Sequence, residues 1–169
     1  MNVHRQTLLD SYFKLAMKPL IKSIRLPFFI KRKFIAAAIK LHQENASHKE
    51  RVETLTNLIG NKDLVWARGV EQLLSEKKEP TIIELVRLFV ENTSFNTYRI
   101  YKQEELKAHL KSDENCQVRV SVSVAFSGNV APCGKRHGEI LENTKATLKA
   151  IPPCSALRCA CDWEVTSTD

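Results

Sequence analysis

Apolar residues recur with the period of α-helices through the first two thirds of the chain. The pattern predicts a first helix that ends near Pro19, because proline lacks the N–H that a helix interior needs. A basic link over 20–27 then leads to a second helix, which Pro27 opens and which runs to about His42. The apolar side of this second helix is expected to consist of Phe28, Phe29, Ile30, Phe34, Ile35 and Ile39.

Further helices are predicted from their end signals. Ser47, followed three residues later by a glutamate, is a capping-box pattern that begins a third helix, and Gly60 is expected to end it. Apolar residues over 64–74 predict a fourth helix. Thr81, again with a glutamate three residues on, predicts the start of a fifth, which carries apolar residues as far as position 90, and a shorter sixth helix fits 103–111.

The spacing of apolar residues changes near residue 118. Valines at 118, 120, 122 and 124 alternate with polar residues, which is the pattern of a half-buried strand. A short strand over 98–101 is expected to pair with it. The sequence therefore predicts an α+β fold, with a helical N-terminal two-thirds and a small, cysteine-rich, strand-containing C-terminal unit.

This change of pattern places the domain boundary between residues 1–112 and residues 113–169. Hydrophobic residues make up 43% of the chain, which is enough for a packed core. The longest apolar runs are too short for a transmembrane helix, and charged residues near the N-terminus argue against a secretory signal peptide. The sequence therefore predicts a location in the cytoplasm. The C-terminal segment, described below, makes this the cytoplasm of a bacterial host or a virion.

Charge is distributed unevenly. The formal net charge is +7, and residues 1–45 hold the whole excess, with nine basic and two acidic side chains. A basic N-terminal segment of this kind favours a negatively charged partner, whether nucleic acid, anionic lipid or an acidic protein surface. The simpler interpretation is a solvated helical face packed on the rest of a bundle. For nucleic acid, the candidate binding residues are Lys22, Arg25, Lys31, Arg32 and Lys33.

The sequence has no DNA-reading motif, and few aromatic residues are available for base stacking. Any contact with nucleic acid is therefore expected to be with the phosphate backbone and independent of sequence. Phosphate-binding and dinucleotide-binding glycine motifs are also absent, as are metalloprotease and hydrolase motifs. These absences favour a protein that is not an enzyme.

Four of the five cysteines lie within the last 37 residues. In a reducing compartment, clustered thiols bind metal more often than they form disulfides. A structural Zn²⁺ site needs four ligands, usually as two close pairs. The preferred set is Cys133, His137, Cys159 and Cys161, with Cys154 as a competing ligand. Thiols without metal and a disulfide are the alternatives.

The same segment allows a catalytic interpretation. His137 and Glu139, followed by Pro153–Cys154 and Cys159, are similar to the H-x-E…P-C-x-x-C signature of zinc deaminases. However, four residues rather than two separate the two cysteines, and thirteen separate Glu139 from the proline. That interval is too short for the deaminase elements, so a closed structural site is predicted.

Residues 118–165 also resemble the C-terminal end of the phage Mu F-like minor head proteins. The matching stretches are 122–126, Val130-Ala-Pro-Cys133, His137-Gly138, Ile151-Pro-Pro153 and Cys159-Ala-Cys161-Asp-Trp-Glu-Val165. The resemblance implies a phage or prophage context, a structural module stabilised by metal, and phage head proteins as partners. It implies no catalysis. The predicted function is thus a head-associated structural protein, with nucleic-acid binding and zinc-dependent deamination as alternatives.

Overall fold

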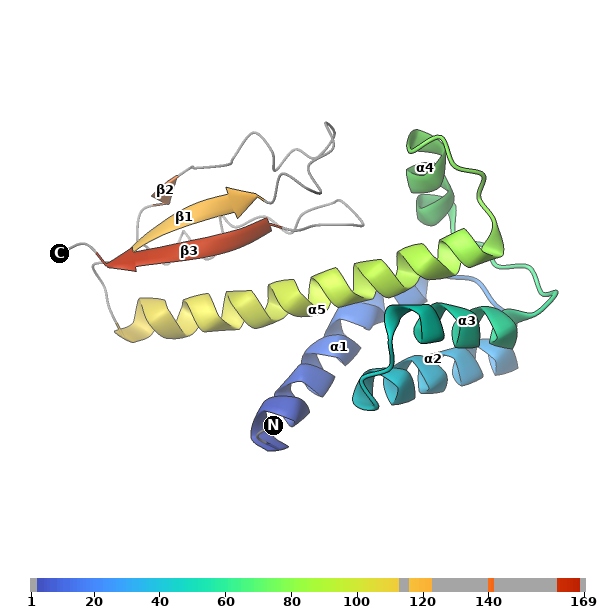
Figure 1. Cartoon of the computed structure of the whole chain (residues 1–169), viewed down its shortest axis with the longest axis horizontal. Coiled ribbons are helices and arrows are strands. Elements are labelled where there is room, and N and C mark those ends of the chain that lie inside the picture. Colours follow the sequence, from blue (N-terminus) through green and yellow to red (C-terminus); the bar gives the residue numbers. More distant parts are fainter. Residues whose placement is uncertain (1–2, 113–115, 123–139, 142–160, 168–169) are drawn as a thin grey trace. The chain divides into compact units, whose positions relative to one another are not determined.

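A computed structural model describes residues 3–112, 116–122, 140–141 and 161–167. Contacts along the chain divide it into two compact units, residues 1–97 and residues 98–169. This division falls inside one long helix, whereas the sequence pattern placed it between residues 112 and 113. The helices and strands are α1 (Val3–Ser23), α2 (Phe28–Gln43), α3 (His48–Ile59), α4 (Ala67–Ser75), α5 (Ile82–Ser112), β1 (Cys116–Val122), β2 (Ile140–Leu141) and β3 (Cys161–Ser167) (Figure 1).

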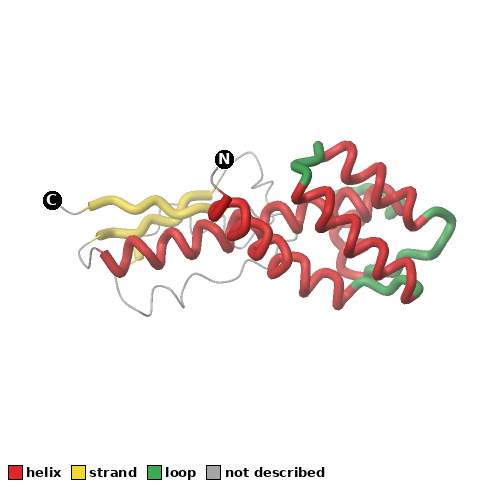
Figure 2. The backbone as a smooth tube through the Cα atoms, turned by 90° about the horizontal axis from the view of Figure 1, so that it is seen from below, coloured by secondary structure: helices red, strands yellow, loops and turns green. Residues whose placement is uncertain are grey.

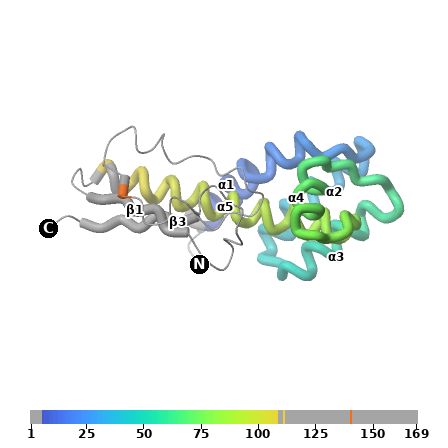
Figure 3. Tube along the Cα trace, turned by 90° about the horizontal axis from the view of Figure 1, so that it is seen from above, coloured from blue at the N-terminus to red at the C-terminus, as the bar shows by residue number. Residues whose placement is uncertain are grey.

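The first unit is a helical bundle whose elements are joined by short loops (Figure 2). Its helices α2 and α3 pack against each other, and α1 packs against α2. Figure 3 shows α2, α3 and α4 gathered together within this unit. Burial of apolar side chains from several helices supplies most of the stability of such a bundle. Its largest fully buried side chains are Trp66, Phe34, Phe89, Ile24, Leu55, Ile59, Leu73, Leu88 and Val86.

The second unit contains a small antiparallel sheet in the order β2-β1-β3. The pairing of β1 with β3 places Val118 opposite Val165 and Val120 opposite Trp163. β1 occupies the first part of the segment in which valines alternate with polar residues, and Val124 lies outside the described residues.

The α+β class predicted from the sequence is wrong. Helices account for most of the residues that the structure describes, and every described core residue belongs to a helix or to one of two links, at Ile24 and Trp66. The part of the chain with a described core is all-α.

The sequence predicted a fifth helix, a short strand over 98–101 and a shorter sixth helix in this region, which is in fact one continuous helix, α5. No glycine or proline interrupts residues 82–112. Polar side chains that favour turns elsewhere bond within the helix instead. Thr93 Oγ1 donates to the Phe89 carbonyl at 2.8 Å, and Thr97 Oγ1 donates to the Thr93 carbonyl at 2.7 Å. The residues that suggested an interruption are therefore accommodated inside one helix.

Two predicted helix ends are also corrected. α1 continues past Pro19 to Ser23, because Leu20 and Ile24 are buried and hold the last turn against the bundle. α4 begins at Ala67 instead of near residue 64, because Val65 is held in an extended bridge with Arg25. In both cases tertiary contacts outweigh the local signal.

Candidate nucleic-acid interface

The link between α1 and α2 is fixed by backbone contacts. Ile24 is 1% exposed and anchors the link in the core. Arg25 forms an antiparallel bridge with Val65, in which the Arg25 N–H donates to the Val65 carbonyl at 2.9 Å and the Val65 N–H donates back at 3.2 Å. Lys31 Nζ donates to the Ile24 carbonyl at 2.7 Å. The link therefore holds the end of α1 and the start of α2 in a defined arrangement.

Helix α2 has one buried face. Phe34, Ala38 and Leu41 follow the spacing i, i+4, i+7, and all three are buried. At 100° per residue, positions 28, 29, 32 and 33 lie on the other side of the helix. All four of these residues are exposed. α2 thus presents a face to solvent at its N-terminal end, and this face contains Phe28, Phe29, Arg32 and Lys33.

The two phenylalanines form an exposed aromatic pair. Phe28 is 67% exposed and Phe29 is 76% exposed. Their ring centroids lie 5.6 Å apart, with an angle of 75° between the ring planes, which is the preferred edge-to-face arrangement. The Arg32 guanidinium carbon lies 5.7 Å from the centre of the Phe28 ring, within the range of a cation–π interaction. The aromatic pair is therefore in direct contact with a cation.

Four of the five predicted cations are exposed to solvent where α1, the link and α2 meet, which we call the joint. Lys22 lies in the last turn of α1, Arg25 lies in the link, and Arg32 and Lys33 lie on α2; all four are exposed. Lys31 is half-buried and binds the Ile24 carbonyl. We call these five residues together with Phe28 and Phe29 the joint surface.

Within the described part of the chain, no ion pair links a cation of the joint surface to a carboxylate. The far end of α2 differs, since Lys40 Nζ lies 3.7 Å from Glu44 Oε1. Positive charge that is not compensated locally attracts polyanions over about a Debye length. Among the described residues, the cations of the joint surface are therefore not neutralised by ion pairs.

The apolar pattern predicted that both phenylalanines belong to the apolar side of the second helix, but both are exposed. The signal that separates them is the phase of the buried stripe. Positions 34, 38 and 41 define the core face, and positions 28 and 29 fall outside that stripe. That stripe is set by what the bundle buries, so the apolar residues of α2 alone do not identify it.

A second polar cluster lies at the C-terminal end of α2. His42 stacks on Phe13, with ring centroids 4.1 Å apart and 9° between the planes. Asp10 accepts hydrogen bonds from Gln6 at 3.0 Å and from Gln43 at 3.1 Å, and its Oδ1 lies 3.5 Å from His42 Nε2. Burial and the nearby positive charge of Arg51 lower the pKa of His42 below its ordinary value of 6.5, and they outweigh the opposing effect of Asp10.

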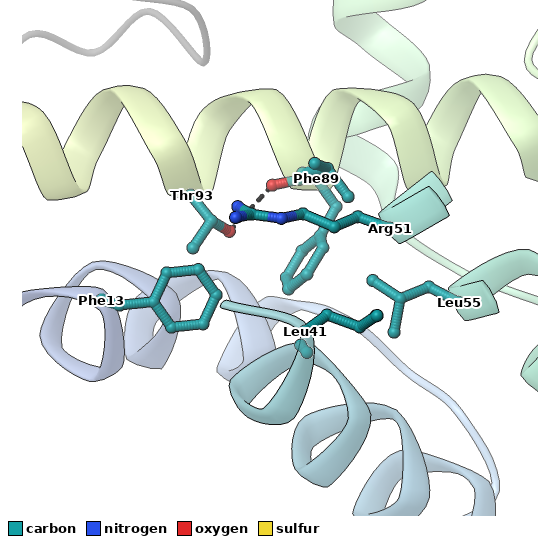
Figure 4. Close-up of a pocket in the computed structure, with 8 residues that line it drawn as sticks. Phe13, Leu41, Arg51, Leu55, Phe89 and Thr93 are labelled. Carbon is teal, nitrogen blue, oxygen red and sulfur yellow. Dashed lines mark hydrogen bonds between the residues drawn. The ribbon is translucent and has the colours of Figure 1, made fainter. Parts of the chain in front are cut away.

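Arg51 borders a small cavity between the helices of the first unit (Figure 4). Its Nε donates to the Ala46 carbonyl at 2.8 Å, and burial lowers its pKa below the ordinary value of an arginine. In Figure 4 its guanidinium lies near Thr93 and Phe89 of α5. The cavity volume is about 10 Å³, which is room for about one water molecule. This cluster therefore has a structural role in helix packing and is too small to bind a ligand.

Most of the predicted zinc ligands lie outside the described residues. This holds for Cys133, His137 and Cys159. Cys161 is the first residue of β3 and is paired with Val122. Over the described ranges alone, no three His, Cys, Asp or Glu residues are grouped as a metal site would require. The zinc site stays a prediction.

The competing ligand Cys154 and the deaminase residue Glu139 also lie outside the described ranges. Of the stretches that resemble minor head proteins, the structure describes only Val122 and residues 161–165, which lie in β1 and β3. The head-associated role and the deaminase alternative therefore stay predictions as well.

Among the described helices, none combines the length and apolar character needed to cross a bilayer. The chain matches no protein-family model, and no curated protein or solved structure shows significant similarity to it.

Proposed function

We propose that this protein binds nucleic acid independently of sequence, through the joint surface. The observation that carries the proposal is the cluster of exposed cations around the α1–α2 link, for which the described part of the chain provides no ion-pair partner. Lysine and arginine side chains of this kind bind phosphate groups by charge and release condensed counterions. The joint surface offers no set of polar side chains arranged to read base edges, so its contacts would be with the phosphate backbone.

The rigidity of the link supports this function. Because the Arg25–Val65 bridge and the Lys31–Ile24 hydrogen bond hold the link, the backbone positions that carry the cations have a defined spacing. A fixed array of charges loses less conformational entropy on binding than a flexible arm. The bundle therefore acts as a scaffold that presents positive charge to a regularly charged polymer.

The salt dependence of binding tests the proposal. Fluorescence anisotropy with a labelled 20-base-pair duplex of arbitrary sequence, repeated at several NaCl concentrations, gives the slope of log K against log[salt]. Contacts with about three to five phosphates predict a slope of about −3 to −4.5. The double variant Arg32→Gln/Lys33→Gln is expected to bind more weakly and to reduce the magnitude of the slope by about 2.

The matched control is Lys40→Gln/Lys49→Gln. These lysines are also exposed, but each pairs with a glutamate one turn along its own helix. The control is expected to retain most of the affinity and the slope. No measurable binding by the wild-type protein at low salt, or an equal loss in the control and in the joint-surface variant, would contradict the proposal.

A further inference from the structure

We infer that the Phe28–Phe29 pair is a base-stacking platform, so that the joint surface binds single-stranded nucleic acid in preference to duplex. The inference rests on the proposed function and specifies the form of its ligand. The first observation is that two large apolar side chains are exposed to solvent instead of being packed in the core. Phe28 and Phe29 are the exposed large apolar residues of α2, a helix that is described in full, and they lie beside Arg32 and Lys33.

The geometry suits stacking. Because the two rings meet edge to face at 75°, the edge of one ring lies against one face of the other, and the remaining ring faces are not covered by this contact. Arg32 lies over the Phe28 ring, and the 76% exposure of Phe29 leaves that side chain accessible to a planar ligand. Single-strand binding sites combine aromatic side chains that stack on bases with cations that hold the backbone. Both components are present here within the first two turns of α2.

Duplex DNA can use only one of these components. Its bases are stacked on one another, so a phenylalanine reaches a base face only by prying base steps apart. A single strand offers its bases and its phosphates together. The joint surface should therefore bind a duplex through charge alone and a single strand through charge and stacking.

An anionic membrane is the main competing partner for a surface that is both basic and aromatic. Interfacial helices insert a continuous apolar face along their length. In α2 the apolar stripe that could do this, formed by Phe34, Ala38 and Leu41, is buried in the bundle. Two adjacent rings at one end of the helix make a local platform instead. The observations therefore favour a nucleic-acid strand.

The experiment compares three probes of equal length: a 20-nucleotide oligothymidine, the corresponding duplex and an abasic single strand. The full-length wild-type protein is expected to bind the oligothymidine most tightly. Phe28→Ala/Phe29→Ala should weaken binding to the oligothymidine about 10- to 100-fold, as expected for the loss of one or two stacked bases. The same variant should change binding to the duplex and to the abasic strand by less than about twofold.

Phe28→Leu/Phe29→Leu separates stacking from general apolar contact. It keeps apolar side chains but removes the aromatic faces, so it should lose oligothymidine affinity nearly as much as the alanine variant. Leu74→Ala removes an exposed apolar residue of α4 and serves as the control that keeps wild-type affinity. Circular dichroism spectra and melting curves confirm that each variant is folded, which the exposure of the mutated positions predicts.

The outcomes distinguish this inference from the proposed function. Salt-dependent binding of single strand and duplex with equal affinity, unchanged by the phenylalanine variants, would overturn the stacking inference and leave the proposed function standing. Absence of binding to every nucleic-acid probe would overturn both. Phenylalanine-dependent binding to phosphatidylcholine/phosphatidylserine vesicles, with oligothymidine binding unaffected, would assign the pair to a membrane and overturn the inference.

Discussion

At the scale of single residues, close contacts between side chains decide which positions tolerate change. Gly69 lies in the first turn of α4, directly against the indole of Trp66, which is 1% exposed. A Cβ atom on Gly69 would lie 2.7 Å from Trp66 Cδ2. Glycine is normally a weak helix former, so helix propensity alone marks this position as a weak point. The structure indicates instead that the absence of a side chain is what lets the indole pack.

Gly69→Ala is therefore expected to lower the free energy of unfolding, although alanine favours helix. Overpacking against a buried ring costs about 1–3 kcal/mol, which exceeds the helix-propensity gain of about 1 kcal/mol. Urea denaturation followed by circular dichroism measures the change. Glu71→Ala, at an exposed position of α4, is the control and should shift stability by less than about 0.5 kcal/mol. A more stable Gly69→Ala variant would show that Trp66 relocates freely.

His42 makes stability depend on pH in a defined direction. Its pKa in the folded state is lowered from 6.5 by burial and by Arg51, so the unfolded state binds more protons between the folded-state pKa and 6.5. Its contribution to the free energy of unfolding is therefore complete above pH 6.5 and is lost as the pH falls below that value. Melting temperatures measured between pH 5 and 8 should show this loss, and His42→Gln should flatten the curve. An unchanged curve in the variant would assign the effect to other groups.

At the scale of elements, the helix ends that are signalled within a few residues were predicted correctly. Ser47 Oγ accepts the Glu50 N–H at 3.2 Å, and Thr81 Oγ1 accepts the Glu84 N–H at the same distance, as the capping patterns indicated. Gly60, at φ 57°, ends α3 as expected. The errors occur where contacts between distant segments determine a helix end. The Arg25–Val65 bridge is an example, because its two residues lie far apart in the sequence.

The end of α4 offers a test of local backbone strain. Lys77 has φ 58°, and the Lys78 N–H donates to the Leu73 carbonyl at 2.9 Å, so Lys77 occupies the left-handed position that glycine favours after a helix. Lys77→Gly should therefore raise the free energy of unfolding, by about 0.5–1 kcal/mol. Thermal unfolding of Lys77→Gly beside Lys77→Ala, which keeps the strained conformation, isolates this effect. Equal stability of the two variants would argue against strain at this position.

At the scale of the whole molecule, the sequence identified the basic residues of the candidate site but not its aromatic part. Charge is visible in composition, because residues 1–45 carry the entire excess. The exposure of Phe28 and Phe29 depends on which face of α2 the bundle buries, and the apolar residues of α2 alone did not fix that face. The fold class was wrong for a related reason. The alternating valines are a local signal, whereas the helical core of the first unit depends on packing between segments that are distant in the sequence.

The chemistry of the cysteine-rich C-terminal unit rests on sequence alone. The zinc site predicted there can be tested independently of nucleic-acid binding by the helical bundle. Purified protein is expected to contain one Zn²⁺ per chain, measured by inductively coupled plasma mass spectrometry. The proposed ligands are Cys133, His137, Cys159 and Cys161.

The Cys159→Ser variant removes one of these four ligands and should lose most of the metal, because a serine hydroxyl is a poor replacement for a thiolate. Cys116→Ser is the matched control, since Cys116 begins β1 opposite Ser167 and is not among the proposed ligands. Structural zinc contributes on the order of 10 kcal/mol to the folding of small metal domains. Metal loss in Cys159→Ser should therefore increase proteolysis of the tail, while residues 1–97 keep their helical signal. Zinc-free wild-type protein prepared without chelators, or equal metal loss in the control, would refute the predicted site.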